Sequence, residues 1–501
     1  MNHRNAYLLA IDQGTTSSRS LIFNELGQIV SMAQKPFRQF YPEPGWVEHD
    51  PMEIWETQLS CVHSAIAQAG LQHHQIQAMG ITNQRETFLL WERASGRPVH
   101  RAIVWQDRRS SALCQQWREQ GHESMVQELT GLLLDPYFSG TKLAWVLKDK
   151  PELRRRAVKG ELCFGTMDSW LIWQLTDKAE HVIDRSNASR TLMMNLSTGQ
   201  WDQAMLELLD IPEAVLPRII DSVLAPDELS PSILGIPITG IAGDQQAALF
   251  GQAAISPGMA KNTYGTGCFM LMQVGSRIRR SHHRLLSTCA WSHNTSDGRM
   301  TMDYALEGSV FVAGAALQWL RDELGLIKHA QESEALAASV NDTGGCYLVP
   351  AFTGLGAPHW DAEARGVISG ITRGTNRAHL VRAALESIAF QSAEVLLAMN
   401  ADAAEPLREL RVDGGASANN WLMQFQADIL GVGVDRPKIL ESTALGVAQL
   451  AGLGCGVFDS VQSCTTMRQS ERLFMPKMSR DEAESKMSAW LSAVDRSKST
   501  R

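Results

Sequence analysis

The sequence predicts an α/β protein built from two domains. A chain of 501 residues is too long for one typical hydrophobic core, so we expect two domains, residues 1–250 and residues 251–501. Strand-like apolar runs alternate with helical segments in both halves of the chain. A Gly-Thr pair lies in a turn beside strand-like runs once in each half, at Gly14-Thr15 and at Gly265-Thr266. Two such turns are expected when a duplicated domain closes on one ligand from both sides.

The composition is that of an ordinary globular protein. Hydrophobic residues make up 44% of the chain and charged residues 20%. The formal net charge of −8 argues against non-specific binding to nucleic acid, which requires a broad basic face. The 8 cysteines are scattered without a C-x-x-C pair, as is typical of reduced thiols. The first apolar run is too short for a signal peptide and no segment is long enough to span a bilayer, so we expect a cytoplasmic protein.

The first Gly-Thr turn has the composition of a phosphate site. Two strand-like runs, Tyr7–Ile11 and Ser20–Phe23, enclose it and predict a hairpin. Gly14 permits close approach of a ligand to the backbone, because it has no Cβ. Backbone N–H groups and hydroxyls cradle phosphates, and Asp12 could hold a hydrated metal ion. The hydroxyl and cationic side chains of this turn are Thr15, Thr16, Ser17 and Arg19. A surface hairpin with a polar tip is the alternative.

The second turn, within Asn262–Met272, repeats this arrangement. No G-x-x-x-x-G-K-[ST] sequence is present, which excludes a P-loop. The Gly-x-Gly at Gly431–Gly433 follows no clear strand and opens no helix, so we expect a loop there and not a dinucleotide site.

Eight segments of the chain, taken together, resemble the FGGY family of carbohydrate kinases. They stand in the family's order between about Tyr7 and about Leu453 and read IDQGTTSSR, TNQRETFLLW, IVWQDRR, DPYFSGTK, GIAGDQQAALFGQ, KNTYGTGCFM, PAFTGLGAPHWD and RVDGGASANN. The resemblance implies two actin-like ATPase (ribonuclease H-like) domains with a central cleft. It also implies phosphorylation of glycerol by ATP with Mg²⁺. The first domain would carry the glycerol site and the first phosphate hairpin, and the second domain the other hairpin and the adenosine site.

The first residues matched to glycerol follow two predicted strands. Arg85 and Glu86 come after Ile76–Ile81 and, as an isolated dipeptide, would be a surface ion pair. The resemblance implies that they hold the hydroxyls of glycerol, since Arg donates and Glu accepts. Trp105 ends the predicted strand Ala102–Trp105. A core aromatic is its commonest role, whereas the resemblance implies packing against the carbon chain of glycerol.

Further glycerol contacts are implied by the same resemblance. Tyr137 and Gln245 match contacting positions, and Phe269 matches an apolar wall. Lys142 opens a predicted helix, Lys142–Leu147, inside a family signature. A structural salt bridge and a catalytic role both stay open for this lysine.

Asp244 follows the predicted strand Ile238–Ile241 and precedes a helix that starts at Ala247. Taken alone, such an aspartate is more often an N-cap than a catalytic group. The resemblance implies that Asp244 is the general base, which accepts the proton of the attacking hydroxyl and aligns its oxygen with the γ-phosphorus.

The remaining matches concern the nucleotide. Thr266 matches a hydroxyl that meets the β/γ-phosphates, and Asp12 would hold Mg²⁺ through water. Gly314 and Gln318 lie at the small-residue start of the predicted helix Ala313–Leu320, where close helix packing is an equally good explanation. The positions matched to ATP are Thr15, Thr16, Ser17, Arg19, Thr266, Gly314, Gln318, Gly415 and Asn419, the last two in the adenosine site.

Other segments predict helices without assigned chemistry. Asp50–Pro51 predicts a helix start, and Trp55, Leu59, Val62 and Ile66 follow at helical spacing and should face the core. We also expect helices at Met167–Leu175, Trp201–Leu209, His379–Met399 and Thr443–Leu453, and a charged helix with a frayed tail in Ser479–Arg501. Asn187–Thr191 belongs to the family pattern but suggests no chemistry.

Regulation and assembly follow the resemblance less closely. The predicted loop Pro226–Pro237 contains DELSPSILGIP where some bacterial relatives have a Gly-rich, Arg-containing loop that binds fructose 1,6-bisphosphate. We therefore expect no strong inhibition by that compound. The resemblance fades past Leu453, and a C-terminal regulator-docking segment finds no clear match. Because family members are commonly dimers or tetramers, a homodimer or homotetramer is expected.

Two other functions are compatible with parts of the sequence. A family member acting on a pentulose or larger polyol would share the fold and the nucleotide site. An actin- or Hsp70-like nucleotide switch would lack a small-molecule acceptor. The polyol matches around Arg85 and Tyr137 argue against the first, and Asp244 argues against the second.

Overall fold

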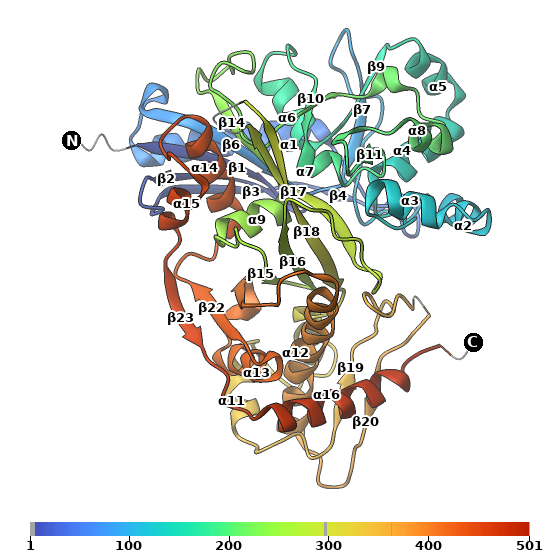
Figure 1. Ribbon diagram of the computed structural model, residues 1–501, viewed down its shortest axis with the longest axis vertical. Helices are drawn as coiled ribbons and strands as arrows, with labels where there is room; N and C mark the ends of the chain where they lie inside the picture. Colours follow the sequence, from blue (N-terminus) through green and yellow to red (C-terminus); the bar gives the residue numbers. More distant parts are fainter. Residues whose placement is uncertain (1–5, 295–297, 362, 500–501) are drawn as a thin grey trace.

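The computed structural model describes residues 6–294, 298–361 and 363–499, arranged as two halves that each contain a central mixed sheet (Figure 1). We call the chain up to α9 the first half and the chain from β15 onward the second half. Within the described ranges, every helix is too short or too polar to span a bilayer.

The first half runs from β1 to α9. Its helices and strands are β1 (Tyr7–Gln13), β2 (Ser17–Asn24), β3 (Ile29–Pro36), β4 (Gln39–Phe40), β5 (Glu48–His49), α1 (Pro51–Ala69), β6 (Ile76–Asn83), β7 (Phe88–Glu92), β8 (Ala102–Ile103), α2 (Ser111–Glu119), α3 (Glu123–Thr130), α4 (Ser139–Asp149), α5 (Pro151–Val158), β9 (Leu162–Thr166), α6 (Met167–Leu175), β10 (Val182–Asp184), α7 (Arg185–Ala188), β11 (Met194–Asn195), β12 (Gln200–Trp201), α8 (Gln203–Leu209), β13 (Arg218–Ile220), β14 (Ile238–Gly243) and α9 (Asp244–Gly251).

The second half runs from β15 to α16. Its helices and strands are β15 (Met259–Tyr264), β16 (Cys268–Gly275), β17 (Leu286–Asn294), β18 (Met300–Val310), α10 (Gly314–Asp322), α11 (Glu332–Ala338), β19 (Tyr347–Val349), β20 (Val367–Ser369), α12 (Arg377–Asp402), β21 (Glu409–Asp413), α13 (Asn420–Leu430), β22 (Gly433–Pro437), α14 (Ser442–Gly454), α15 (Val461–Cys464), β23 (Ser470–Phe474) and α16 (Arg480–Asp495). Short 3₁₀ turns η1 (His73–Gln75), η2 (Glu213–Val215), η3 (Gly415–Ala418) and η4 (Thr465–Met467) complete the chain.

The two central sheets repeat one strand arrangement. The first sheet has the order β3-β2-β1-β6-β14, with β1, β2 and β3 antiparallel and β6 and β14 parallel to β1. In the second, the strands β18-β16-β15-β21-β22 have the same order and the same directions. The predicted duplication is therefore confirmed. Both Gly-Thr turns join the first two strands of their own sheet, so they occupy equivalent positions.

A segment late in the chain returns to the first half. Figure 1 shows α14 beside β1 and β6 of the first sheet. Helix α14 packs directly on α9, since a Cβ on Gly446 would lie 1.8 Å from the carbonyl oxygen of Ala247. It also packs on the sheet, since a Cβ on Gly80 would lie 2.2 Å from the carbonyl oxygen of Val447. The domain boundary predicted near residue 250 stays a prediction. A single boundary there would assign α14 to the second domain, although this helix packs on the first half.

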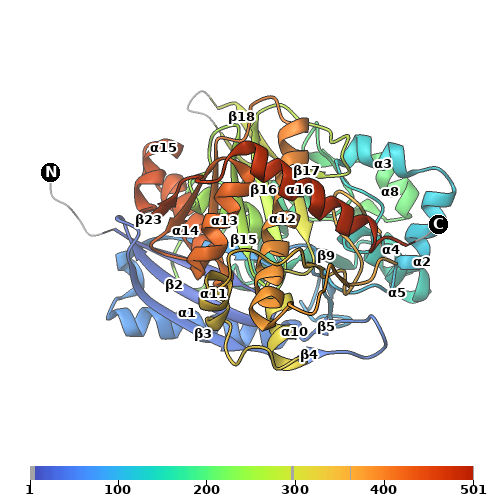
Figure 2. The ribbon, with the colours of Figure 1, turned by 90° about the horizontal axis from the view of Figure 1, so that it is seen from below.

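The C-terminal helix covers the second half. Figure 2 shows α16 alongside α12 and α13. Trp490 is fully buried, stacks on Phe390 with ring centroids 5.2 Å apart, and donates from Nε1 to Glu394 Oε1 at 2.6 Å. The predicted helix in Ser479–Arg501 ends at Asp495, and the last two residues of the predicted tail lie outside the described residues.

Helix α1 begins where the sequence predicts. Asp50 is its N-cap and accepts from the N–H of Met52 at 2.9 Å, with Pro51 at the first helical position. The predicted buried stripe is shifted, however. Val62 and Ile66 are buried, but Trp55 and Leu59 are only half-buried, because the face toward the sheet is centred on Ile54, Gln58, Cys61 and Ala65.

Several predicted boundaries need correction. Strand β8 stops at Ile103, because the N–H of Trp105 donates to the Thr87 side chain. Helix α8 starts at Gln203 and not Trp201, since Asp202 caps it by accepting from the N–H of Met205. Gly433 opens strand β22 and is not part of a loop. The face predicted for residues 379–399 is buried, but α12 is buried on almost every side and is not amphipathic.

Two buried carboxyls organise the segment Asn187–Thr191, which sequence reasoning left without a role. Asp184 caps α7 and accepts from the N–H groups of Ser186 and Asn187 at 2.9 and 3.0 Å. Asp168 lies behind it, hydrogen-bonded to Thr166 at 2.5 Å. Burial, and then the charge of Asp184, raise the pKa of Asp168 to about 7.

Asp168→Asn is expected to flatten the pH dependence of stability. The raised pKa means that, between about pH 4 and pH 7, the folded protein keeps a proton on Asp168 that the unfolded chain has released. This contribution to stability is complete below about pH 4 and is lost as the pH rises through 7. Asparagine can preserve the hydrogen bond to Thr166 without ionising. Thermal unfolding at pH 5, 6, 7 and 8 should show the wild type losing stability relative to the variant, and parallel curves would contradict the assignment.

Candidate active site

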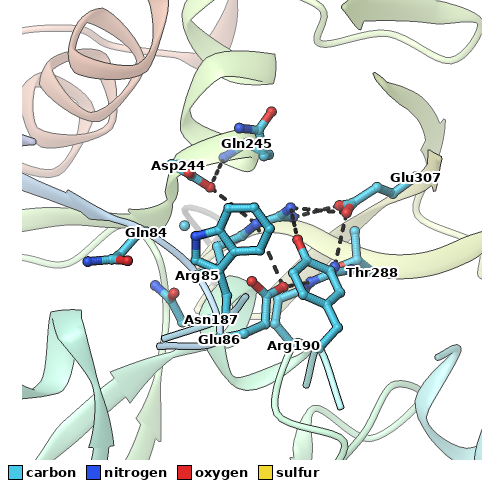
Figure 3. A network of polar contacts seen from close by, with 12 residues as sticks. Gln84, Arg85, Glu86, Asn187, Arg190, Asp244, Gln245, Thr288 and Glu307 are labelled. Atoms are coloured by element: carbon cyan, nitrogen blue, oxygen red, sulfur yellow. Dashed lines mark hydrogen bonds and ion pairs between the residues drawn. The ribbon is translucent and has the colours of Figure 1, made fainter. Parts of the chain in front are cut away.

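The residues matched to glycerol come from separate segments, and the structure brings them together between the halves. Arg85 and Glu86 lie in the turn between β6 and β7, and Asp244 and Gln245 open α9 (Figure 3). Trp105 and Tyr137 follow β8 and precede α4, whereas Phe269 comes from β16 of the second half. Glu86 has φ 61°, a strained backbone for a non-glycine residue. Such strain is concentrated at functional sites, where neighbouring contacts impose it.

Arg85 is the centre of a buried ion-pair network. Its side chain is 2% exposed, and its guanidinium donates to Glu307 through Nη1 at 2.6 Å and Nη2 at 3.0 Å. Its Nε lies 3.2 Å from Asp244 Oδ1 and 3.9 Å from Glu86 Oε1. Glu86 receives a shorter hydrogen bond, 2.6 Å, from Nε of Arg190. The two predicted glycerol residues are thus buried and held by partners that the sequence analysis did not assign.

Asp244 is not the N-cap of α9, since Gly243 occupies that position. Its side chain is 32% exposed, so it is accessible to solvent, and Oδ1 accepts from the N–H of Gln245 at 2.7 Å. Desolvation raises the pKa of Asp244, while the positive charges of Arg85 and Lys261 oppose that rise. Nearby cations favour the ionised form of a carboxylate, so Arg85 and Lys261 support a role for Asp244 as a base.

Gln245 is bound from the second half. Lys261 of β15 donates from Nζ to the side-chain oxygen of Gln245 and, at 3.0 Å, to Thr263 Oγ1. Lys261 is fully buried, and burial lowers its pKa to about 8 although Asp413 and Asp244 oppose the shift. The second half therefore places the Lys261 ammonium next to Gln245 and close enough to Asp244 to influence its charge.

Aromatic rings form one wall of the site. The ring centroids of Trp105 lie 5.7 Å from Tyr137 and 6.3 Å from Phe269, both nearly edge to face. Lys142 supports this wall, since its buried Nζ donates to the carbonyls of Pro136 at 3.0 Å and Tyr137 at 2.6 Å. Lys142 therefore holds the turn that carries Tyr137.

The first Gly-Thr hairpin is hydrogen-bonded to Gln84 and Trp105, which lie beside the residues matched to glycerol. The turn closes with a hydrogen bond from the N–H of Gly14 to the carbonyl of Ser17 at 3.0 Å, and Thr16 is exposed at its tip. Thr15 Oγ1 accepts from Trp105 Nε1 at 3.1 Å. The Gln84 side chain, next to Arg85, donates to the carbonyl of Gly14 at 3.2 Å. The hairpin turn and the residues after β6 and β8 are therefore joined by direct hydrogen bonds.

Arg19 and Asp12 face each other across β1 and β2. Arg19 Nη2 lies 2.5 Å from Asp12 Oδ2, and its Nη1 lies 2.6 Å from Glu441 Oε2, just before α14. Burial raises the pKa of Asp12, with Arg19 opposing. Arg19 would have to exchange one of these carboxylates to bind a phosphate. Its assignment to ATP stays a prediction.

The second hairpin exposes Gly265 and Thr266 and is clamped by α10. The N–H of Gly314 donates to the carbonyl of Gly265 at 3.0 Å, and Ala315 donates to that of Thr266 at 3.1 Å. A Cβ on Gly314 would lie 2.6 Å from the Gly265 oxygen. The small residues thus serve close packing, and these N–H groups are not directed at a ligand. Contacts of Gly314 and of the exposed Gln318 with a nucleotide remain predictions.

The predicted adenosine residues lie at the two ends of η3, with Gly415 as its first residue and Asn419 directly after it. Gly415 is exposed, and a Cβ added there would meet no atom of the described residues within 4 Å. Asn419 caps α13, accepting from the N–H of Leu422 at 3.0 Å, and donates to Ser333 at 3.2 Å. Gly414 brings this turn onto the second hairpin strand, with its Cβ position 2.6 Å from the carbonyl oxygen of Tyr264. The segment is therefore adjacent to the hairpin, and its contact with adenosine stays a prediction.

Three charged residues of the site were not found from the sequence. Arg190, Lys261 and Glu307 are all 0% exposed. A glutamate next to the apolar residues of β18 is unusual, so the sequence around Glu307 contains a signal for a buried charge. Arg190 lay in a segment that was noted but left without chemistry.

The duplicated sheets with paired hairpin turns have the actin-like ATPase architecture. Two family models match the chain: the N-terminal domain of the FGGY family of carbohydrate kinases over residues 7–251, and its C-terminal domain over residues 260–455. The chain belongs to the FGGY family of carbohydrate kinases.

Individual relatives agree with this membership. A protein of Polaromonas sp. (strain JS666 / ATCC BAA-500) named glycerol kinase is 57% identical over 494 residues, covering 97% of this chain and 98% of its own. The crystal structure of Plasmodium falciparum glycerol kinase with ADP has a TM-score of 0.92 at 37% identity and covers 99% of both chains. A ligand-bound xylulose kinase from Lactobacillus acidophilus, 22% identical with a TM-score of 0.86, covers 98% of this chain and 97% of its own and shows the shared fold alone. Similarity extends past Leu453, where the motif-based resemblance faded.

Proposed function

We propose that this protein is a glycerol kinase, which transfers the γ-phosphoryl group of ATP to glycerol and yields sn-glycerol 3-phosphate and ADP. The observation that carries the proposal is the position of Asp244, whose Oδ1 lies 3.2 Å from Arg85 Nε while its side chain stays 32% exposed. Relatives named glycerol kinase, at 57% identity over nearly the whole chain, support it.

In this proposal residues of the first half, together with Phe269 of the second half, bind and orient the polyol. Arg85 donates to glycerol hydroxyls, Glu86 accepts from one, and the rings of Trp105 and Phe269 enclose the carbon chain. Asp244 accepts the proton of the attacking hydroxyl and aligns its oxygen with the γ-phosphorus. Because phosphoryl transfer is loose, alignment contributes early and proton removal late, so an ordinary carboxylate suffices. Closure of the cleft would exclude water as a competing acceptor.

ATP and Mg²⁺ belong to the same proposal. The hydroxyls of Thr15, Thr16, Ser17 and Thr266, with backbone N–H groups of the two turns, suit phosphate oxygens. Within the described ranges, no group of three or more Asp, Glu, His or Cys residues is arranged to hold a metal ion. We propose that the ion is held by phosphates and water, with Asp12, whose Oδ2 also accepts from Arg19 at 2.5 Å, as its carboxylate. When bound, Mg²⁺ would neutralise charge on the β- and γ-phosphates.

Thr266→Val is expected to raise the KM for ATP about tenfold and the KM for glycerol less than twofold. The exposed hydroxyl would lose a hydrogen bond to a charged phosphate, which typically contributes about 1.5–3 kcal/mol. Steady-state kinetics with each substrate varied would measure both constants. Thr466→Val, at another exposed threonine, should leave both unchanged. Equal losses for ATP and glycerol in Thr266→Val would rule out the nucleotide role.

The function itself is tested by ADP release from Mg·ATP with and without millimolar glycerol, with ribulose, xylulose and dihydroxyacetone in parallel. Turnover stimulated by glycerol supports the kinase and its substrate together. Turnover with a pentulose alone would keep the nucleotide site and replace the polyol assignment. ATP hydrolysis that no acceptor stimulates would replace the kinase with a nucleotide switch.

The proposal includes a cytoplasmic location and a homodimer or homotetramer. The 8 cysteines are free thiols, as a reducing compartment requires. Light scattering coupled to size exclusion would measure the oligomeric state, and a monomer would contradict that part of the proposal.

A further inference from the structure

Glu307 is a charged residue of the second half whose side chain, among the described residues, accepts hydrogen bonds from two arginines of the first half. It sits in β18 among apolar neighbours and is 0% exposed. Its two oxygens accept from both Nη atoms of Arg85, at 2.6 and 3.0 Å, and Oε1 also accepts from Arg190 Nη2 at 2.9 Å. Figure 3 shows these contacts on the side of Arg85 opposite Asp244. A bidentate pair of this kind fixes the plane of a guanidinium as well as its position.

The orientation of the Arg85 guanidinium determines which of its atoms contacts Asp244. Since both Nη atoms are directed at Glu307, the Nε edge of the guanidinium is the part that approaches Asp244, at 3.2 Å. Rotation of the guanidinium would break that contact and would also move the donors assigned to the polyol. Glu307 therefore acts on Asp244 through Arg85.

Glu307 also reaches Glu86, through Arg190. Arg190 donates from Nη2 to Glu307 and from Nε to Glu86 Oε1 at 2.6 Å. Burial by itself would raise the pKa of Glu307, but Arg190 and Arg85 outweigh burial and hold this pKa at about 2. Glu307 is therefore ionised throughout the pH range in which an enzyme is normally assayed.

We propose that Glu307 is a positioning residue of the polyol site, which sets the orientation of Arg85 directly and of Glu86 through Arg190. This inference rests on the proposed function, because it concerns how the same site holds its acceptor. The second half then contributes a charged positioning residue to the acceptor site, in addition to the ring of Phe269. An ion pair that merely joins the halves would affect stability and not the acceptor.

Glu307→Gln tests the proposal, because glutamine keeps the shape and removes the charge. We expect the KM for glycerol to rise at least tenfold and kcat to fall about 10- to 100-fold, since small misplacement of substrate-orienting groups has effects of this size. The KM for ATP should change less than twofold. Isothermal titration calorimetry with glycerol should show the same loss of affinity without turnover.

Glu386→Gln is the matched control. Glu386 is 4% exposed on α12 and binds Arg382 at 2.9 Å, so it is a buried ion-pair glutamate of the same half without a place in the site. It should lower the Tm as Glu307→Gln does and leave kcat and both KM values unchanged. If Glu307→Gln lowers the Tm but leaves the glycerol KM and kcat at wild-type values, the positioning role is overturned.

A second variant tests the proposal if Glu307→Gln does not fold. Glu307→Asp keeps the charge but withdraws the carboxylate by one methylene. Glu307→Asp should still raise the glycerol KM, and an unchanged KM would overturn the proposal.

If the wild type fails to use glycerol but uses another acceptor, the proposed function fails by itself. The same comparison with that acceptor then decides the role of Glu307.

Discussion

Asp244→Asn is expected to lower kcat by about 10³-fold while changing the affinity for glycerol less than threefold. A general base contributes about 10²- to 10⁴-fold. Asparagine preserves the shape and accepts from the N–H of Gln245, which Asp244 now does at 2.7 Å, but it cannot take the proton of the attacking hydroxyl. Rapid-quench measurement of ADP formation gives the rate, and calorimetry with glycerol gives the affinity.

The pH profile supplies a second readout for Asp244. The base acts as a carboxylate, so activity should fall as the pH drops through its pKa. Because burial raises that pKa above its ordinary value, the acidic limb should lie above pH 4. The residual activity of the asparagine variant should lack this limb. Asp435→Asn, at a buried aspartate paired with Arg468 at 2.6 Å, should retain it. Near-wild-type turnover by Asp244→Asn would remove the base assignment.

The parts of the fold that local sequence determines were predictable. Asp50 before Pro51 defines the start of α1 through a side-chain cap and a fixed φ, both of which are local. The two hairpins follow from strand-forming runs around Gly-Thr turns. The stripe on α1 was misplaced because half-buried Trp55 satisfies helical spacing as well as Ile54 does, and only the packing against the sheet selects between them.

Contacts between distant segments were not predictable from one sequence. Glu307 lies 222 residues from Arg85 and 117 from Arg190, so no local pattern relates them. The return of α14 to the first sheet depends on glycines such as Gly446, whose small size has several explanations in sequence. For the site, the family resemblance identified the residues around Asp244. The buried network that balances their charges could not be predicted, because its members come from distant parts of the chain.

Arg85→Met is expected to have the largest combined effect on stability and activity. The buried network contains two arginines and two glutamates, so its charges balance. Removal of Arg85 leaves Glu307 and Glu86 with Arg190 alone. Breaking a buried ion pair on one side costs about 3–5 kcal/mol, because an uncompensated charge remains buried. Thermal unfolding should show a large loss of Tm, and glycerol-dependent turnover should be abolished.

The double variant Arg85→Met/Glu307→Met separates the two roles of Arg85. It restores charge balance, since Arg190 and Glu86 remain paired at 2.6 Å, and two apolar side chains of similar volume replace the other pair. Buried ion pairs replaced in this way often lose little stability. We therefore expect the double variant to recover most of the Tm lost in Arg85→Met but none of the turnover. Recovery of turnover would show that Arg85 contributes through charge balance alone, and a Tm as low as that of the single variant would show that its contacts with Asp244 and Gln246 dominate.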